Sequence, residues 1–134
     1  MTSKVIYTGN LRTQATHLRS GNSIITDAPT DNHGRGEAFS PTDLAATSLA
    51  TCMLTVMGIY AEGRGIKLDD STADVTKIMA ENPRRIAEIH VDVFIHTVLP
   101  DKERQQLEHI GLNCPVAKSL HPDVKQVVKF SYPV

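Results

Sequence analysis

The chain contains two cysteines, Cys52 and Cys114, and no other residues offer such distinctive chemistry. They lie far apart in the sequence, and no Cys-x-x-Cys motif is present. A cysteine in an apolar stretch is usually a small buried hydrophobe. Cys114, however, precedes Pro115 at a predicted helix start, where free backbone amides stabilise a thiolate. Two cysteines are also the number that a peroxidatic and resolving pair requires.

The residues around Cys52 add to this interpretation. Thr51 and Thr55 stand beside it, and a purely structural core would not need such polar neighbours. The residues alone leave two interpretations open, a redox pair or inert thiols. A metal site that joins the two thiols to His109 and His121 is not expected, because the spacing matches no usual zinc pattern.

A long helix is predicted around Cys52, over the stretch that runs from Ser40 to Gly65. Ser40 can cap the helix, Pro41 suits the first helical position, and Asp43 has the spacing of a capping box. Gly63 and Gly65 predict a left-handed stop at the other end. Residues 44–61 contain no charged side chain. A helix that is apolar nearly all round is buried nearly all round, so we expect this one to be the central core element.

The position of Cys52 in the middle of the predicted helix indicates that a reactive thiolate there would need a nearby cation. The residue lies about three helical turns from Pro41, too far to benefit from the helix dipole. A thiol that is buried among apolar groups stays protonated at neutral pH unless a cation is delivered to it. No cation follows on the same helix before Arg64. We therefore expect an arginine from the N-terminal segment or from a second subunit, because arginine keeps its charge when desolvated.

The other predicted elements surround this helix. Strands are predicted at Lys4–Tyr7, Gln14–Leu18 and Ser23–Asp27, which form an antiparallel meander, and a polar loop follows at Ala28–Glu37. Alternating apolar residues predict a β-hairpin from Thr72–Ala80 and Arg85–Leu99, with Ile89, Val91, Val93 and Ile95 on the buried face.

The last part of the chain is predicted to hold two helices and a strand. The first helix opens at Pro100-Asp101 and has Leu107, Ile110 and Leu112 as its apolar positions; a short helix at Val116–Leu120 and a strand at Val124–Tyr132 follow. The order of strands, long helix, strands, helices and strand predicts one α+β domain over residues 1–134.

The composition and the net charge limit which partners and which cellular compartment we expect for this protein. The chain has 134 residues, is 40% hydrophobic and 22% charged, and carries a formal net charge of -1. This balance is typical of a soluble globular protein and predicts neither a nucleic-acid partner nor a membrane partner. The first residues lack the apolar region of a signal peptide, which predicts a cytoplasmic protein.

Two segments resemble one known family. The segment from Ser40 to Val56, Ser-Pro-Thr-Asp-Leu-Ala-Ala-Thr-Ser-Leu-Ala-Thr-Cys-Met-Leu-Thr-Val, and Asn-Cys-Pro-Val-Ala-Lys-Ser-Leu near the C-terminus are similar to the OsmC/Ohr family of thiol-dependent peroxidases. The resemblance implies an intertwined homodimer with its long helices at the centre. It implies that Cys52 is the peroxidatic cysteine and Cys114 the resolving one, and that organic hydroperoxides are reduced. The expected reductant is an external dithiol of the lipoyl type, with no metal, flavin or haem.

The sequence departs from the better-characterised members at one position. Those members have Glu directly after the proline, where this chain has Thr42, and the acid here is Asp43, as in a third, less characterised branch of the family. In the family this acid holds an arginine from the loop after the first strand over the thiolate. By resemblance Asp43 would orient Arg12, with Arg19 as second candidate and Arg35 as third.

Two other functions remain open at this point. Because Thr42 stands in place of Glu, one alternative is a non-catalytic protein that binds a small apolar or thiol-reactive ligand at the dimer interface. A structural dimer with inert thiols is the third interpretation.

Overall fold

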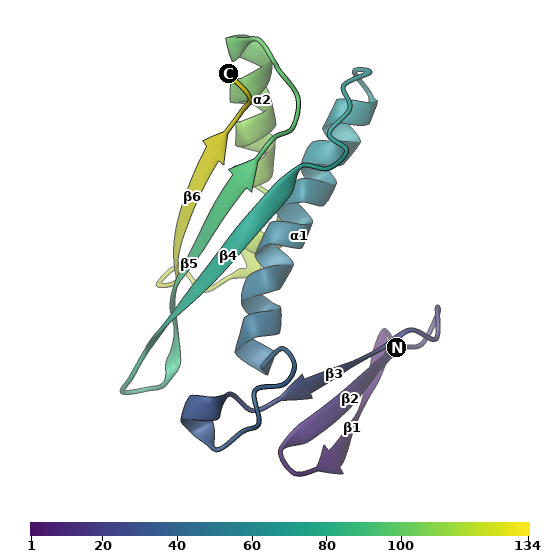
Figure 1. Cartoon of the computed structure of the whole chain (residues 1–134), viewed down its shortest axis with the longest axis vertical. Coiled ribbons are helices and arrows are strands. Elements are labelled where there is room, and N and C mark those ends of the chain that lie inside the picture. The colour runs from purple at the N-terminus through teal and green to yellow at the C-terminus, as the bar shows by residue number, and fades with distance from the viewer. The chain divides into compact units, whose positions relative to one another are not determined.

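The computed structural model describes all residues from Met1 to Val134, which divide into two compact units (Figure 1). The first unit comprises Met1–Ala45 and the second Ala46–Val134. The helix α1 (Pro41–Glu62) begins in the last residues of the first unit and runs through the second. The predicted α+β class is confirmed.

The first unit is an antiparallel sheet of three strands, as the sequence predicts. The strands β1 (Ser3–Gly9), β2 (Arg12–His17) and β3 (Ser23–Asp27) pair in this order. A single 3₁₀ turn, η1 (Thr30–Asn32), lies in the polar segment that follows. Arg12 is the first residue of β2 and not part of the preceding loop, so this detail of the prediction was wrong.

The apolar side chains of this sheet are exposed. Val5 lies opposite Ala15, and Ala15 lies opposite Ile24, so the three share one face. Val5 and Ile24 are nevertheless exposed on that face, and Ile6 and Ile25 are exposed on the other. Because the residues buried in this unit are the polar Thr26, Asp27 and Ser40, its sheet has no apolar core of its own.

The helix α1 is capped as predicted. The amide of Asp43 donates to Ser40 Oγ, and the amide of Ser40 donates to Asp43 Oδ2, both over 3.0 Å. This reciprocal pair is a capping box with Asp in place of the usual Glu. Past the other end, Gly65 has a φ of 69°, the left-handed conformation that suits glycine.

The expectation that α1 is buried nearly all round is not met within one chain. Its buried residues, which share one face, are Ala46, Leu49, Ala50, Met53, Met57 and Ala61. Thr51, Thr55 and Ile59 lie exposed on the opposite face, with Ile59 67% exposed. By length and composition alone α1 could cross a membrane, but the core helix of a soluble protein passes the same test.

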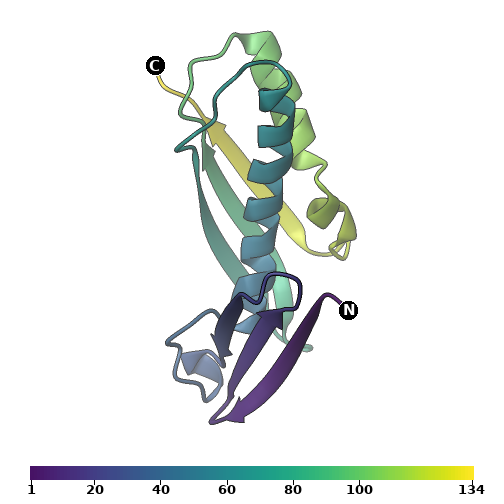
Figure 2. The ribbon, with the colours of Figure 1, turned by 90° about the vertical axis from the view of Figure 1, so that its right-hand side faces the viewer.

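The second unit packs α1 and a second helix on one face of a sheet (Figure 2). The strands β4 (Thr72–Ala80) and β5 (Arg85–Phe94) form the predicted hairpin, and β6 (Lys125–Ser131) pairs in parallel with β5. The helices α2 (Asp101–Leu112) and α3 (Pro115–Ser119) connect β5 to β6. This parallel pairing requires a crossover connection, which the two helices provide.

The core of this unit follows the predicted alternation along β5. Ile89, Val91, Val93 and Ile95 are all buried, although the strand ends at Phe94 rather than at Leu99. On α2, Leu107 is buried as predicted, whereas Leu112 is 47% exposed. Gly111 takes the buried position instead, since a Cβ there would lie only 2.7 Å from Met57 Sδ.

Candidate functional site

The second unit brings the two cysteines close together. Cys52 is half-buried in the middle of α1, and Cys114 is 1% exposed at the start of α3. Cys52 packs against the core cluster that contains Cys114, close enough to influence the protonation of its thiol, and both cysteines are reduced. Residues from distant parts of the sequence therefore form one dithiol site, in which Cys52 is the more accessible member.

The local backbone explains how Cys114 reaches this position. Asn113 caps the end of α2, and Pro115 starts α3 directly afterwards. Cys114 is left between them as the N-cap of α3, and its Sγ accepts a hydrogen bond from the amide of Ala117 over 3.4 Å. The predicted helix start at this cysteine is confirmed.

Burial raises the pKa of the Cys114 thiol above its ordinary value. The neighbouring Cys52 raises it further, while the amide of Ala117 acts in the opposite direction. Cys114 is therefore held mainly as a thiol at neutral pH. A buried thiol next to a more accessible one suits the second step of a two-thiol reaction better than the first.

The two threonines beside Cys52 do not provide its polar surroundings. The hydroxyl of Thr51 donates to the Ser48 carbonyl over 3.0 Å, and that of Thr55 donates to the Thr51 carbonyl over 2.7 Å. Both side chains are exposed and satisfy their hydrogen bonds within the helix. This part of the argument for a reactive Cys52 was therefore wrong.

In the first unit, Arg12 pairs with a carboxylate that the sequence analysis did not consider. Arg12 Nε donates to Asp27 Oδ1 over 2.7 Å, and Nη2 donates to Asp27 Oδ2 over 2.9 Å. Asp43 was expected to form this bidentate pair, but its carboxylate accepts the Ser40 amide in the helix cap. The register of the sheet places Arg12 directly opposite Asp27 and so explains the difference.

This ion pair is strongly coupled. Hydrogen bonds from Arg12 hold the pKa of the Asp27 carboxyl below its ordinary value, although burial acts in the opposite direction. The same contact raises the pKa of Arg12. The signal that could have revealed Asp27 is the cross-strand position of opposite charges, which requires the register as well as the strands.

The other two candidate arginines are exposed. Arg19 lies in the turn after β2 and makes no ion pair, whereas Arg35 Nη1 lies 4.0 Å from Glu37 Oε1. No group of three or more His, Cys, Asp or Glu side chains converges in the structure.

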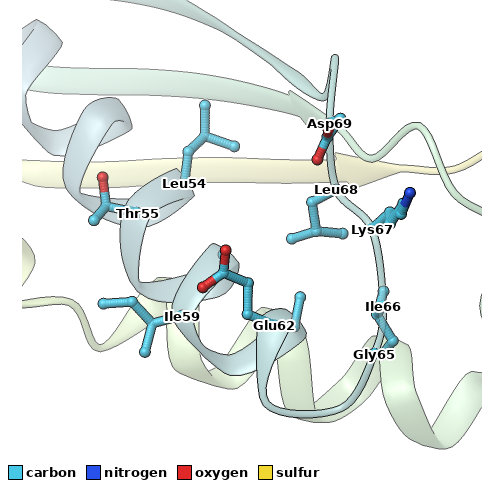
Figure 3. A pocket seen from close by; sticks show the side chains of 11 residues that line it. Leu54, Thr55, Ile59, Glu62, Gly65, Ile66, Lys67, Leu68 and Asp69 are labelled. Carbon is cyan, nitrogen blue, oxygen red and sulfur yellow. The ribbon is translucent and has the colours of Figure 1, made fainter.

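The second unit also contains a groove that the sequence analysis did not indicate. Its volume is about 540 Å³, and it lies between the second half of α1 and the segment 65–69 (Figure 3). Leu54, Ile59 and Leu68 line it together with Glu62. The groove begins two residues beyond Cys52 along the helix.

Comparisons with known proteins agree with this fold. The profile of the OsmC-like protein family matches residues 34–129. A crystal structure from Psychrobacter arcticus 273-4, provisionally named an osmotic stress induced and detoxification response protein, is 55% identical, with a TM-score of 0.95. That match covers 98% of this chain and 96% of the other. No curated protein matches the chain.

Two more distant structures have the same fold. The organic hydroperoxide resistance protein OsmC of Legionella pneumophila, also described as a redox protein, is 20% identical, with a TM-score of 0.72 and coverage of 98% and 97%. An organic hydroperoxide resistance protein of Vibrio cholerae, so named provisionally, has captopril bound in one of its active sites. It is 15% identical, with a TM-score of 0.74 and coverage of 97% and 91%. The family profile and the Psychrobacter relative together show that the chain belongs to the family of OsmC-like proteins.

Proposed function

We propose that this protein is a thiol-dependent peroxidase that reduces organic hydroperoxides through Cys52 and Cys114. The observation that carries the proposal is the proximity of the half-buried Cys52 to the buried Cys114. The names of the Legionella and Vibrio structures support hydroperoxides as the substrate class. The family membership supports the same assignment.

The reaction consists of two steps at the dithiol site. The Cys52 thiolate attacks the terminal peroxide oxygen, the O–O bond breaks, and the alkoxide takes up a proton and leaves as an alcohol. Cys52 becomes a sulfenic acid. The Cys114 thiolate then attacks the Cys52 sulfur, the hydroxyl group leaves with a proton as water, and a disulfide forms.

An external dithiol closes the cycle. It transfers two electrons to the disulfide by thiol–disulfide exchange and is itself oxidised to a disulfide. We propose a dithiol of the lipoyl type as this reductant and no bound cofactor.

Two further residues support the reaction in this proposal. Arg12 is the cation that favours the Cys52 thiolate, with Arg19 and Arg35 as the remaining candidates. Asp43 contributes through the cap that fixes the start of α1. Its negative charge also stabilises the positive end of the helix dipole.

We propose a homodimer as the active form, intertwined as in the family resemblance. The apolar side chains on the first unit and the exposed face of α1 support it, because contiguous apolar surface on a soluble protein marks an interaction site. A soluble cytoplasmic protein without nucleic-acid or membrane partners fits the net charge of -1. Light scattering at micromolar concentration should report the mass of two chains.

A steady-state assay with cumene hydroperoxide and dihydrolipoamide tests the enzymatic function. The wild type should consume hydroperoxide with multiple turnovers, and Cys52→Ser should abolish the consumption. Cys114→Ser should retain one turnover and accumulate oxidised Cys52. A wild type that consumes no hydroperoxide with any dithiol would contradict the proposal.

Ligand binding without catalysis is the second candidate function. Captopril in an active site of the Vibrio structure favours it, because a small thiol compound occupies that site. Thr42 also stands where better-characterised relatives carry Glu. Mass spectrometry distinguishes the two functions, since Cys52 that stays unmodified after excess organic hydroperoxide would favour binding.

A further inference from the structure

A second pocket lies in the second unit, between the end of α1 and the second half of α2. Its volume is about 380 Å³, which falls within the range of about 300–1,000 Å³ that is typical of small-molecule sites. All of its lining belongs to this one unit. The residues that line it are Tyr60 and Arg64 from α1 and the turn that follows, and Gln105, Gln106, His109 and Ile110 from α2.

Two contacts between the helices show where this pocket lies relative to the cysteines. Gly111 packs against Met57, and the hydroxyl of Tyr60 lies 3.2 Å from Glu103 Oε2, so α1 and α2 run antiparallel. Tyr60 follows Cys52 by eight residues, which corresponds to about 12 Å along the helix. The pocket is therefore separate from the dithiol site, although the same helix contributes to both.

The ring of Tyr60 forms a fixed apolar wall of the pocket. Its hydroxyl lies within hydrogen-bond distance of Gln106 Oε1 as well as of Glu103 Oε2. The guanidinium carbon of Arg64 lies 4.7 Å from the centre of the ring, in a cation–π contact. Ile110 adds aliphatic surface to the lining. An apolar wall and a cation therefore stand side by side.

The lining contains hydrogen-bond donors and no carboxylate. Arg64 is its one permanently charged residue, and no carboxylate lies within ion-pair distance of it. Gln106 has its oxygen at the Tyr60 hydroxyl, which leaves its Nε2 group to donate. Asn113 Nδ2 lies 3.5 Å from His109 Nδ1, which leaves Nε2 as the ring nitrogen that carries a hydrogen. These groups favour an anion.

We propose that this pocket binds an amphipathic monocarboxylate, with its carboxylate on Arg64 and its alkyl chain on Tyr60 and Ile110. A planar guanidinium matches a planar carboxylate through two parallel N–H donors. One cation balances one negative charge, so phosphate and other multiply charged anions fit less well. The groove of about 540 Å³ has Glu62 and Asp69 in its lining and is less suited to an anion.

The exposure of the lining determines how the affinity divides between charge and chain. Arg64 is exposed, whereas Tyr60 and Ile110 are half-buried. An ion pair at an exposed position changes an equilibrium by up to about fivefold. Each CH₂ group that leaves water contributes up to about fourfold. The chain therefore supplies most of the affinity, and Arg64 supplies the preference for a carboxylate.

The test compares octanoate with n-octanol, which has the same chain length and no charge, by two-dimensional proton–nitrogen NMR of the full chain. Octanoate should shift the amides of residues 60–64 and 105–110. Acetate, which lacks the chain, should bind at least about tenfold more weakly. Arg64→Gln should reduce the preference for octanoate over n-octanol about fivefold.

Lys102→Gln is the matched control. It removes the same charge from an exposed position on α2 that does not line the pocket. The preference for octanoate should stay unchanged in this variant, and circular dichroism checks that both variants are folded. An equal loss in Arg64→Gln and Lys102→Gln would overturn the inference, as would shifts confined to other residues. Acetate or inorganic phosphate that binds as tightly as octanoate would also overturn it.

This inference goes beyond the proposed function and does not rest on it, because neither Cys52 nor Cys114 lines the pocket. A protein with both cysteines replaced by serine should bind octanoate with the same affinity. Absence of octanoate binding in a protein that consumes hydroperoxide would overturn this inference alone. Binding at this pocket by a protein that consumes no hydroperoxide would contradict only the proposed function.

Discussion

The second unit encloses its apolar side chains, whereas the first unit leaves most of its apolar side chains exposed. Leu49, Met53, Ile89 and Leu107 are fully buried between the helices and the β4–β5–β6 sheet. In the β1–β2–β3 sheet, Val5, Ile6, Tyr7, Ile24 and Ile25 remain exposed. The same chain thus contains one enclosed hydrophobic core, in the second unit, and one sheet whose apolar faces are exposed to solvent, in the first.

This difference in burial between the two units indicates which parts of the candidate site would depend on a second chain. Both cysteines belong to the second unit and lie close together within a single chain. Arg12, which we propose as the activator of Cys52, belongs to the first unit, whose apolar side chains are exposed. We therefore expect disulfide formation to survive changes that weaken the proposed dimer, and thiolate activation to be more sensitive to such changes.

The largest expected effect is a loss of stability caused by a substitution in the enclosed core of the second unit. Leu107→Ala should lower the free energy of unfolding by about 2–5 kcal/mol, because it leaves a cavity in a packed interior. Leu112→Ala on the same helix should change it by less than about 0.5 kcal/mol, since Leu112 is exposed. Urea unfolding compares the two, and equal losses would contradict the assignment of the core.

Substitutions on the exposed apolar face of the β1–β2–β3 sheet should change the affinity between two chains. Val5→Thr combined with Ile24→Thr should weaken the proposed dimer by about 1–3 kcal/mol, because both side chains belong to one exposed apolar face. Light scattering over a dilution series measures the shift. Val98→Thr, in a loop of the second unit, is the control that should leave the mass unchanged, and an equal shift there would remove the contrast.

The burial of Cys114 predicts how fast the disulfide forms at each pH. Because the pKa of Cys114 is raised, its thiolate fraction still increases throughout the neutral range. Disulfide formation after peroxide addition should accelerate about tenfold for each pH unit between about pH 6 and pH 8. Timed quenching with N-ethylmaleimide followed by mass spectrometry measures the rate. A rate that is flat over this range would show that the thiolate is already formed.

A smaller effect is expected at the start of α1, where the two units join along the chain. Ser40→Ala removes the acceptor for the Asp43 amide and should cost about 1 kcal/mol of stability. Ser40→Thr keeps a hydroxyl and should recover most of the loss. Thermal unfolding compares the three proteins, and an unchanged Ser40→Ala would argue against a stabilising cap.

The sequence was sufficient for features that depend on local patterns. The ends of α1 followed from its caps, and the buried face of β5 followed from strict alternation. The position of Cys114 at a helix start followed from the proline after it. Each of these signals lies within a few residues of the feature that it predicts.

Features that depend on contacts between elements could not be predicted in this way. Asp27 became visible only when the register placed it opposite Arg12. Gly111 replaced Leu112 in the core because Met57, on a different helix, leaves no room for a side chain. The one-sided burial of α1 likewise depends on which elements pack against it and not on its own composition.

The most direct test of the dithiol chemistry is the mass of the tryptic peptides after a stoichiometric addition of cumene hydroperoxide. Cys52 lies in the peptide 36–64 and Cys114 in the peptide 105–118. The proposed mechanism predicts that the two peptides are recovered joined by a disulfide, and that dihydrolipoamide separates them again. Recovery of both peptides with free thiols, from folded protein exposed to excess hydroperoxide, would contradict it.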